Sequence, residues 1–187
     1  MVKDTNAIKL HLGCGPRHID GFVHVDARPF GHVDHMQAIE ALDCFADGSV
    51  DLIYASHVLE HFGRHVYMSV LREWFRVLRP GGVLRLSVPD FAKTVQVYLL
   101  EQNAKKGMAP HWGALVGGQR DPLDFHNTVF DQVTLDTSLR EVGFADVRLW
   151  DWRKTEHAHV DDYSQAYWPH MDKENGILMS LNMEGIK

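Results

Sequence analysis

The chain has 187 residues, 45% of them apolar and 24% charged, a composition typical of one globular domain and not of a disordered chain. Its formal charge of −6 disfavours general binding to nucleic-acid phosphates. No apolar run reaches the ~18 residues of a membrane helix, no basic and apolar leader begins the chain, and two cysteines make no disulfide framework. These features predict a cytoplasmic protein and leave its oligomeric state open.

Strand and helix patterns alternate along the first half of the chain. Apolar residues recur at every fourth position from Val66 to Leu78 and predict a helix over 65–78, which the sequence Arg-Pro-Gly-Gly at 79–82 ends. Short runs with strand character lie on either side of this helix. The strands expected in this half are 8–12, 22–25, 33–36, 50–55 and 83–88.

The second half is less regular. Helices are expected at 91–105 and 132–142, with a glycine-rich loop at 107–121 between them, and strands at 147–150 and 177–183. The polar and aromatic segment 151–176 is interpreted as an insertion or lid. The predicted fold class is α/β: a Rossmann-like, doubly wound, mostly parallel seven-stranded sheet with helices on both faces, in a single domain spanning 1–187.

A glycine turn and an acid suggest a nucleoside site. Gly13 and Gly15 follow the first strand, and Asp26 ends the second, where a carboxylate can accept both ribose hydroxyls. A dinucleotide fingerprint would need a third glycine where His18 stands and an acid ~20 residues further on. Residues 16–21 are also too few for the helix that binds a pyrophosphate. A cofactor with ribose and no phosphate, such as S-adenosylmethionine (SAM), fits better, although a plain tight turn with a capping acid would explain the same residues.

Four segments in order carry a resemblance to a known family: LHLGCGP (10–16), GFVHVD (21–26), FADGSVDLIYASHVLEHF (45–62) and LRPGGVLRLSVPD (78–90). Together they resemble a class I SAM-dependent methyltransferase, and within it the compact group often encoded among bacterial cell-surface glycan genes. Weaker likeness continues through DFHNTVFD (124–131), LREVGF (139–144) and SLNMEGIK (180–187).

The resemblance implies roles for particular residues. The methionine half of the cofactor would lie on Gly13, Cys14 and Gly15, and the ribose on Asp26 and Ala27. Ser56 and His57 would lie near the sulfonium. Family members commonly place an Asp near the adenine after the third strand, whereas this chain has Gln37-Ala38-Ile39. Either backbone groups or Gln37 would then replace that acid, with Ile39 packed on the adenine ring.

A competing motif lies in the same place. His57-Val58-Leu59-Glu60-His61 also has the pattern H-x-x-E-H, which on a helix lets two histidines bind zinc with the glutamate as general base. The third zinc ligand would have to be Glu101 or Glu141. The alternative is that His61 is simply a hydrogen-bonded residue in the first turn of a helix. Histidines and aspartates at 32–35 and 157–162 are further candidates for a divalent ion, but no metal is assigned.

Methyl transfer to a hydroxyl requires a group that removes the hydroxyl proton. His126 is the first candidate and Asp90 the second, followed by His57 and His111; Asp90 would equally serve as the cap of a helix at 91, and His126 as a structural hydrogen-bonding residue. The function predicted is O-methylation of a glycan or another small polar acceptor, and four of the five tryptophans follow residue 110, where they would suit a sugar. The alternatives are a non-catalytic module that binds SAM or S-adenosylhomocysteine, and an H-x-x-E-H zinc hydrolase.

Overall fold

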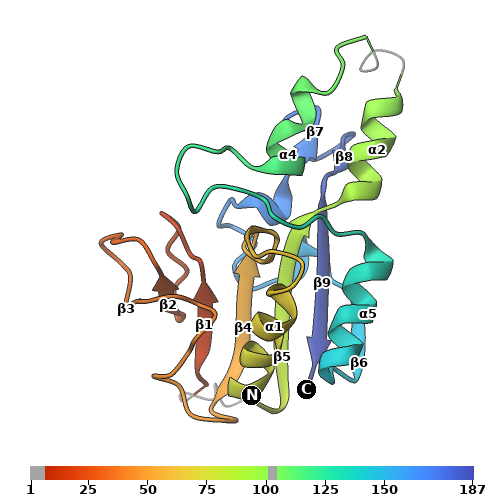
Figure 1. The fold of residues 1–187 in the computed structure, drawn as a ribbon. Coiled ribbons are helices and arrows are strands. Elements are labelled where there is room, and N and C mark those ends of the chain that lie inside the picture. The colour runs from red at the N-terminus through yellow and green to blue at the C-terminus, as the bar shows by residue number, and fades with distance from the viewer. Residues whose placement is uncertain (1–6, 101–104) are drawn as a thin grey trace.

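The computed structural model describes residues 7–100 and 105–187 and contains a seven-stranded sheet (Figure 1). The strand order is β3-β2-β1-β4-β5-β9-β6; β9 runs antiparallel to both of its neighbours, and every other pairing is parallel. This arrangement confirms the Rossmann-like α/β fold class. The strands are β1 Lys9–Leu12, β2 Val23–Asp26, β3 His35–Met36, β4 Val50–Ser56, β5 Leu78–Pro89, β6 Asp146–Leu149 and β9 Ser180–Ile186.

The helices follow the strands in the expected order. The α-helices are α1 Tyr67–Val77, α2 Phe91–Leu99, α4 Trp112–Val116 and α5 Gln132–Val142. Four short 3₁₀ helices are η1 Leu59–His61, η2 Ala109–His111, η3 Trp152–Lys154 and η4 Tyr163–Gln165. Between β1 and β2 the chain makes turns and no crossover helix, as the length of 16–21 predicts. The carboxyl edge of the sheet next to β1 is therefore formed by a loop and not by a helix N-terminus.

One face of the sheet is apolar and lies under α1 and α5. Alternate strand residues such as Leu12, Ile53 and Leu86 point to this face and are fully buried. Trp74 of α1 is also fully buried, and its indole Nε1 donates to the Ile39 carbonyl at 2.9 Å. Burying each large apolar side chain contributes about 1.5–3 kcal/mol, so this face supplies most of the fold's stability.

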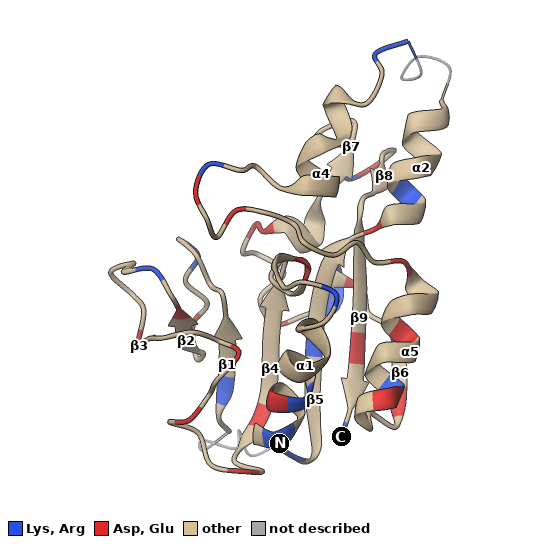
Figure 2. Ribbon diagram, in the orientation of Figure 1, with Lys and Arg blue, Asp and Glu red and all other residues tan. Residues whose placement is uncertain are grey.

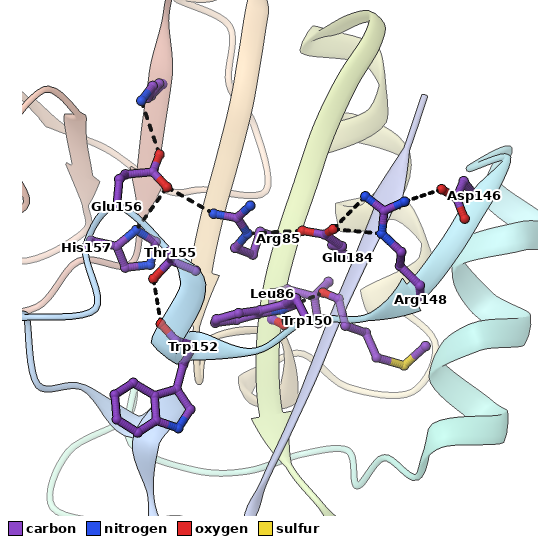
Figure 3. Close-up of polar contacts among 12 residues, drawn as sticks. Arg85, Leu86, Asp146, Arg148, Trp150, Trp152, Thr155, Glu156, His157 and Glu184 are labelled. Atoms are coloured by element: carbon purple, nitrogen blue, oxygen red, sulfur yellow. Dashed lines mark hydrogen bonds and ion pairs between the residues drawn. The ribbon is translucent and has the colours of Figure 1, made fainter.

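The opposite face of the sheet, here called the polar face, buries polar side chains such as His11 beside a second apolar cluster around Phe22 and Leu52. Residues 150–165 cover this face. Tyr54 of β4 is fully buried there and donates its hydroxyl proton to Asp162. Arg85 lies between Glu184, at 3.1 Å, and Glu156, at 3.3 Å (Figure 3). Because these contacts tie segment 151–176 to the strands, much of that segment packs as a cover on the sheet.

Several predicted element boundaries are wrong. The strand expected at 83–88 begins at Leu78, directly after α1. The loop expected at 107–121 contains η2 and α4. The last strand is interrupted at Met179, whose N–H donates to Ala166, so that Ile177–Leu178 forms β8 against β7 (Tyr167–Trp168) in a separate small sheet. The helix expected at 91–105 ends at Leu99, and the positions 101–104 of that prediction lie outside the described residues. Within the described ranges, no helix has the length and apolarity needed to cross a bilayer.

Candidate active site

The turn after β1 and the end of β2 form one hydrogen-bonded unit around Asp26. The Gly15 N–H donates to Asp26 Oδ2, and the Arg28 N–H donates to Oδ1, each at 2.8 Å. The Gly13 N–H donates to the Val25 carbonyl at 2.8 Å. Asp26 is thus held, largely buried, at the carboxyl end of β2, and each carboxylate oxygen keeps a lone pair for a further donor. Two adjacent ribose hydroxyls match that requirement.

The two glycines of this turn have similar backbone angles but different surroundings. Gly13 has φ +60°, and a Cβ there would lie 2.6 Å from Val58 Cγ2. Gly15 has φ +55°, and its Cβ would meet no atom within 4 Å. A ligand can therefore approach the backbone at Gly15. Cys14 between them is buried, and burial raises the pKa of its thiol to about 12, so only its backbone is available to a ligand.

The carboxyl end of β4 presents Ser56 and His57. Ser56 Oγ accepts a hydrogen bond from Ser87 Oγ at 3.1 Å. His57 has φ +53°, a strained value for a residue with a side chain, and its N–H donates to the Ser87 carbonyl. Its ring lies 3.0 Å from Ser180 Oγ and 5.3 Å, between centroids, from Tyr163. Burial lowers the pKa of His57 to about 3, so the imidazole is neutral.

Next to His57, Glu60 is a buried carboxyl group. Only 1% of the residue is exposed, and neither carboxyl oxygen has a hydrogen-bond partner in the described part of the chain. Its Oε1 lies 3.4 Å from His57 Nδ1 and 3.8 Å from His126 Nε2. Burial raises the pKa of Glu60 to about 8. Sequence reasoning considered Glu60 only as the base of a hydrolase; the structure makes it the centre of three histidines.

Hydrogen bonds join the segment around η1 to residues 124–130. The Glu60 carbonyl accepts from Asn127 N–H at 2.8 Å and from Thr128 N–H at 3.1 Å. The Asn127 side chain donates to the His61 carbonyl, and the Thr128 hydroxyl donates to the Phe62 carbonyl. These contacts bring His126, which is distant in sequence, to the end of β4.

The two predicted catalytic residues have different surroundings. The His126 Nδ1–H donates to the Ala114 carbonyl of α4 at 3.1 Å, which leaves Nε2 as an acceptor facing Glu60. Burial lowers the pKa of His126, which favours this neutral form. Asp90 directly precedes α2, and its side chain caps this helix by accepting a hydrogen bond from the Lys93 N–H. His111, the fourth candidate, is buried in η2 against Tyr98.

The loop between α4 and residue 130 reaches back toward the cofactor turn. Figure 2 shows basic and acidic residues at its outer end. Asp121 of this loop accepts two hydrogen bonds from the Arg28 guanidinium, at 2.7 and 2.9 Å. Since the Arg28 N–H also contacts Asp26, the loop that carries His126 is connected to the residues expected at the ribose.

The helix assumed for the H-x-x-E-H motif is not formed. Residues 59–61 make one 3₁₀ turn, and His57 precedes it with a left-handed backbone, so His57 and His61 do not share a helix face. His61 instead has the hydrogen bond of the alternative interpretation, to the Phe125 carbonyl at 3.0 Å. The groups at 32–35 and 157–162 do not bring three ligand atoms together. Among the described residues, only Glu60, His61 and His126 do so, within 4.8 Å.

Comparisons with known proteins agree with this geometry. Residues 24–86, from β2 into β5, match the family described as a methyltransferase domain. None of the curated proteins compared with the chain matches it. A SAM-dependent methyltransferase from Archaeoglobus fulgidus has a similar structure, with a TM-score of 0.59 and 17% identity over 97% of this chain and 86% of that one. The 1,6-didemethyltoxoflavin-N1-methyltransferase of Burkholderia thailandensis, solved with 1,6-didemethyltoxoflavin and S-adenosylhomocysteine, gives a TM-score of 0.56 and 16% identity over 97% and 71%.

Residues 24–86 are thus similar to a methyltransferase domain, and the fold is shared with solved structures of SAM-dependent methyltransferases. The family match covers Asp26, Ser56, His57 and Glu60, whereas Asp90 and His126 lie beyond it. The solved structures share the fold along almost the whole chain. In α/β sheets of this kind, ligands bind at the carboxyl ends of the strands.

Where the resemblance to the family implies an acid that contacts adenine, the chain has an amide, Gln37. The Gln37 N–H donates to the Asp26 carbonyl, and the side-chain Nε2 of Gln37 is buried without a partner in the described residues. Ile39 packs in the main core, 8% exposed, and Ala27 is exposed beside Asp26. Sequence reasoning missed Tyr163, Arg28 and Asp121. The ring contact of Tyr163 with His57 and the ion pair of Arg28 with Asp121 join distant parts of the chain and leave no local pattern.

Proposed function

We propose that this protein is a SAM-dependent methyltransferase that transfers the SAM methyl group to a hydroxyl of a glycan or of another small polar acceptor. The observation that carries the cofactor half of the proposal is the Asp26 carboxylate, fixed by two backbone N–H groups with lone pairs left for the ribose. The methionine half would lie along Gly13, Cys14 and Gly15 and approach Ser56 and His57. Gln37 would donate its free amide hydrogen to the adenine, beside Ile39 and Ala27.

The acceptor half of the proposal rests on His126. Its Nε2 lone pair lies at the sheet edge where β4 ends, and its Nδ1–H is already committed to Ala114. In the simplest mechanism His126 removes the hydroxyl proton while the oxygen attacks the methyl carbon in line with the sulfur, a contribution of ~10²–10⁴ in rate. Asp90 would orient the acceptor from the neighbouring strand. Trp112, 60% exposed on the helix that holds His126, offers a flat face for a sugar ring.

The state of the two cysteines supports a cytoplasmic location for this enzyme. Cys14 is buried and Cys44 exposed, and both are free thiols. Structural disulfides are rare in reducing compartments, so an unpaired exposed thiol fits such a compartment.

Calorimetric titration with S-adenosylhomocysteine tests the cofactor half. Asp26→Ala removes a charged hydrogen-bond acceptor worth ~1.5–3 kcal/mol, so we expect at least a ten-fold loss of affinity. Asp20→Ala is the matched control, because that side chain lies between the same strands and is 93% exposed. Equal affinities in wild type and Asp26→Ala would refute the ribose role. Tight cofactor binding without methylation of any hydroxyl compound or cell extract would instead indicate the non-catalytic module.

A further inference from the structure

Among the described residues, no contact of the Glu60 side chain explains why this carboxyl group is buried. It is 1% exposed, and both carboxyl oxygens are buried without a hydrogen-bond donor among the described residues. A buried polar group normally has a partner, and a buried carboxyl group stays neutral unless a positive group pairs with it. A cationic ligand would supply the partner that Glu60 lacks.

Two histidines near this carboxyl group keep a free lone pair, and His126 Nε2 lies 3.8 Å from Glu60 Oε1. His61 Nδ1 lies 3.0 Å from the Phe125 carbonyl, and His126 Nδ1 lies 3.1 Å from the Ala114 carbonyl. A carbonyl can only accept, so each Nδ1 carries the hydrogen and each Nε2 of the neutral ring keeps its lone pair. Metal-binding histidines are commonly oriented in this way, by donating the other ring N–H to a carbonyl.

The spacing of the three side chains suits one ion. A nitrogen of each histidine and an oxygen of Glu60 lie within 4.8 Å of one another. With metal–ligand distances of about 2.0–2.2 Å, the ligand atoms of a tetrahedral ion lie roughly 3.4 Å apart, so a small side-chain movement would close the site. The hydrogen bonds of Asn127 and Thr128 to the Glu60 carbonyl hold the two contributing segments together.

We propose that Glu60, His61 and His126 bind a divalent transition-metal ion whose open coordination position takes the acceptor hydroxyl. Two imidazoles and one carboxylate favour ions such as Zn²⁺ or Co²⁺ over Mg²⁺ or Ca²⁺, which prefer oxygen ligands. Three protein ligands leave at least one position for substrate. The use of this site in methyl transfer rests on the proposed function; the binding of the ion does not.

With the ion bound, His126 is a ligand and no longer the proton acceptor. The coordinated hydroxyl becomes more acidic and releases its proton to a water molecule. Its oxygen forms a bond to the methyl carbon while the bond between that carbon and sulfur breaks. The electron pair of the broken bond stays on sulfur, which gives a methyl ether and S-adenosylhomocysteine.

The test is titration of chelator-treated full-length protein with Co²⁺, followed by visible absorption, and with Zn²⁺, followed by calorimetry. We expect one ion per chain in the wild type and at least a ten-fold weaker affinity in Glu60→Gln and in His126→Gln. His32→Ala is the matched control, because His32 belongs to another group of close imidazole rings, with His18 and His24, that lacks the three-ligand geometry. It should bind the ion like the wild type. Circular dichroism and S-adenosylhomocysteine affinity establish that each variant is folded.

Absence of stoichiometric binding, or equal binding by wild type and the folded Glu60→Gln variant, would overturn the inference. Turnover by metal-free protein at the rate of the metal-loaded protein would overturn the role of the ion in transfer while leaving the proposed function intact. Failure to bind S-adenosylhomocysteine, with Co²⁺ still bound in the wild type, would instead count against the proposed function alone.

Discussion

Two groups of histidines, one buried and one half-buried, differ in what surrounds them. The sheet group, His11, His24 and His157, lies on the polar face of the sheet, with His157 4.3 Å from Tyr54 between ring centroids. The site group, His57, His61 and His126, lies around Glu60. Burial lowers the pKa of all six histidines, so a perturbed pKa does not separate the groups.

The difference between the groups lies in their carboxylates. Near the sheet group, Asp162 accepts from the Tyr54 hydroxyl and from the Ser164 N–H, and Asp34 accepts from the His24 N–H. Glu60 in the site group accepts nothing from the described residues. A satisfied carboxylate stabilises packing, whereas an unsatisfied one beside free imidazole lone pairs is available to a ligand. The comparison predicts effects on chemistry in one group and on stability in the other.

The largest effect is expected from the site group. His126→Ala removes the Nε2 lone pair facing Glu60, which accepts the hydroxyl proton in the metal-free mechanism and binds the ion in the metal-bound one. In either role its loss should lower turnover, by ~10²–10⁴ where it acts as the proton acceptor. S-adenosylhomocysteine affinity should stay within two-fold of the wild type, since Asp26 and the glycine turn are unchanged. Steady-state kinetics with calorimetry measures both quantities. Full turnover in this variant would remove His126 from the mechanism.

An intermediate effect is expected from the sheet group, and only on stability. Burial and the neighbouring His24 and His157 lower the pKa of His11 to about 3, so below pH 6.5 the unfolded chain binds a proton that the folded chain does not. The free energy of unfolding should therefore fall as the pH decreases from 7 to 5, by about 1.4 kcal/mol per pH unit for one such histidine once the unfolded form is protonated.

Urea unfolding of the wild type and of His11→Asn at pH 7, 6 and 5 checks this expectation. The variant should show a shallower dependence, by up to one proton, because one titrating side chain has been removed. If the free energy of unfolding depends on pH with the same slope in both proteins, His11 does not cause the dependence. The effect on stability would then not distinguish the sheet group from the site group.

The smallest effect is expected at the edge of the sheet group. The His18 side chain is 56% exposed and stacks on His24 at 4.7 Å between ring centroids. His18→Ala should change the free energy of unfolding by no more than about 0.5 kcal/mol, and turnover not at all. Thermal unfolding and an activity assay are sufficient. A loss of several degrees in Tm would show that the sheet group extends to the surface.

The sequence predicted the cofactor side better than the acceptor side, for a physical reason. Strand alternation, the glycine turn and Asp26 are local patterns, and they predicted β1 to β4 to within two residues, whereas β5 begins earlier than expected, at Leu78. The approach of His126 to Glu60 depends on backbone hydrogen bonds from Asn127 and Thr128 across more than sixty residues, which no local period encodes.

The sequence also did not predict that the polar face of the sheet is buried. Alternation places His11 and Tyr54 opposite the apolar residues, but a polar residue in such a pattern normally faces solvent. Here residues 150–165 cover that face and bury both side chains. The contact depends on a segment whose polar and aromatic composition predicts no regular element.

A crystal structure of the protein with S-adenosylhomocysteine tests the central claim most directly. We expect both ribose hydroxyls within hydrogen-bond distance of the Asp26 carboxylate, and the sulfur at the end of β4 on the side of His57 and Glu60. A nucleoside bound elsewhere, or a sulfur directed away from Glu60 and His126, would contradict the assignment of the cofactor and acceptor sides.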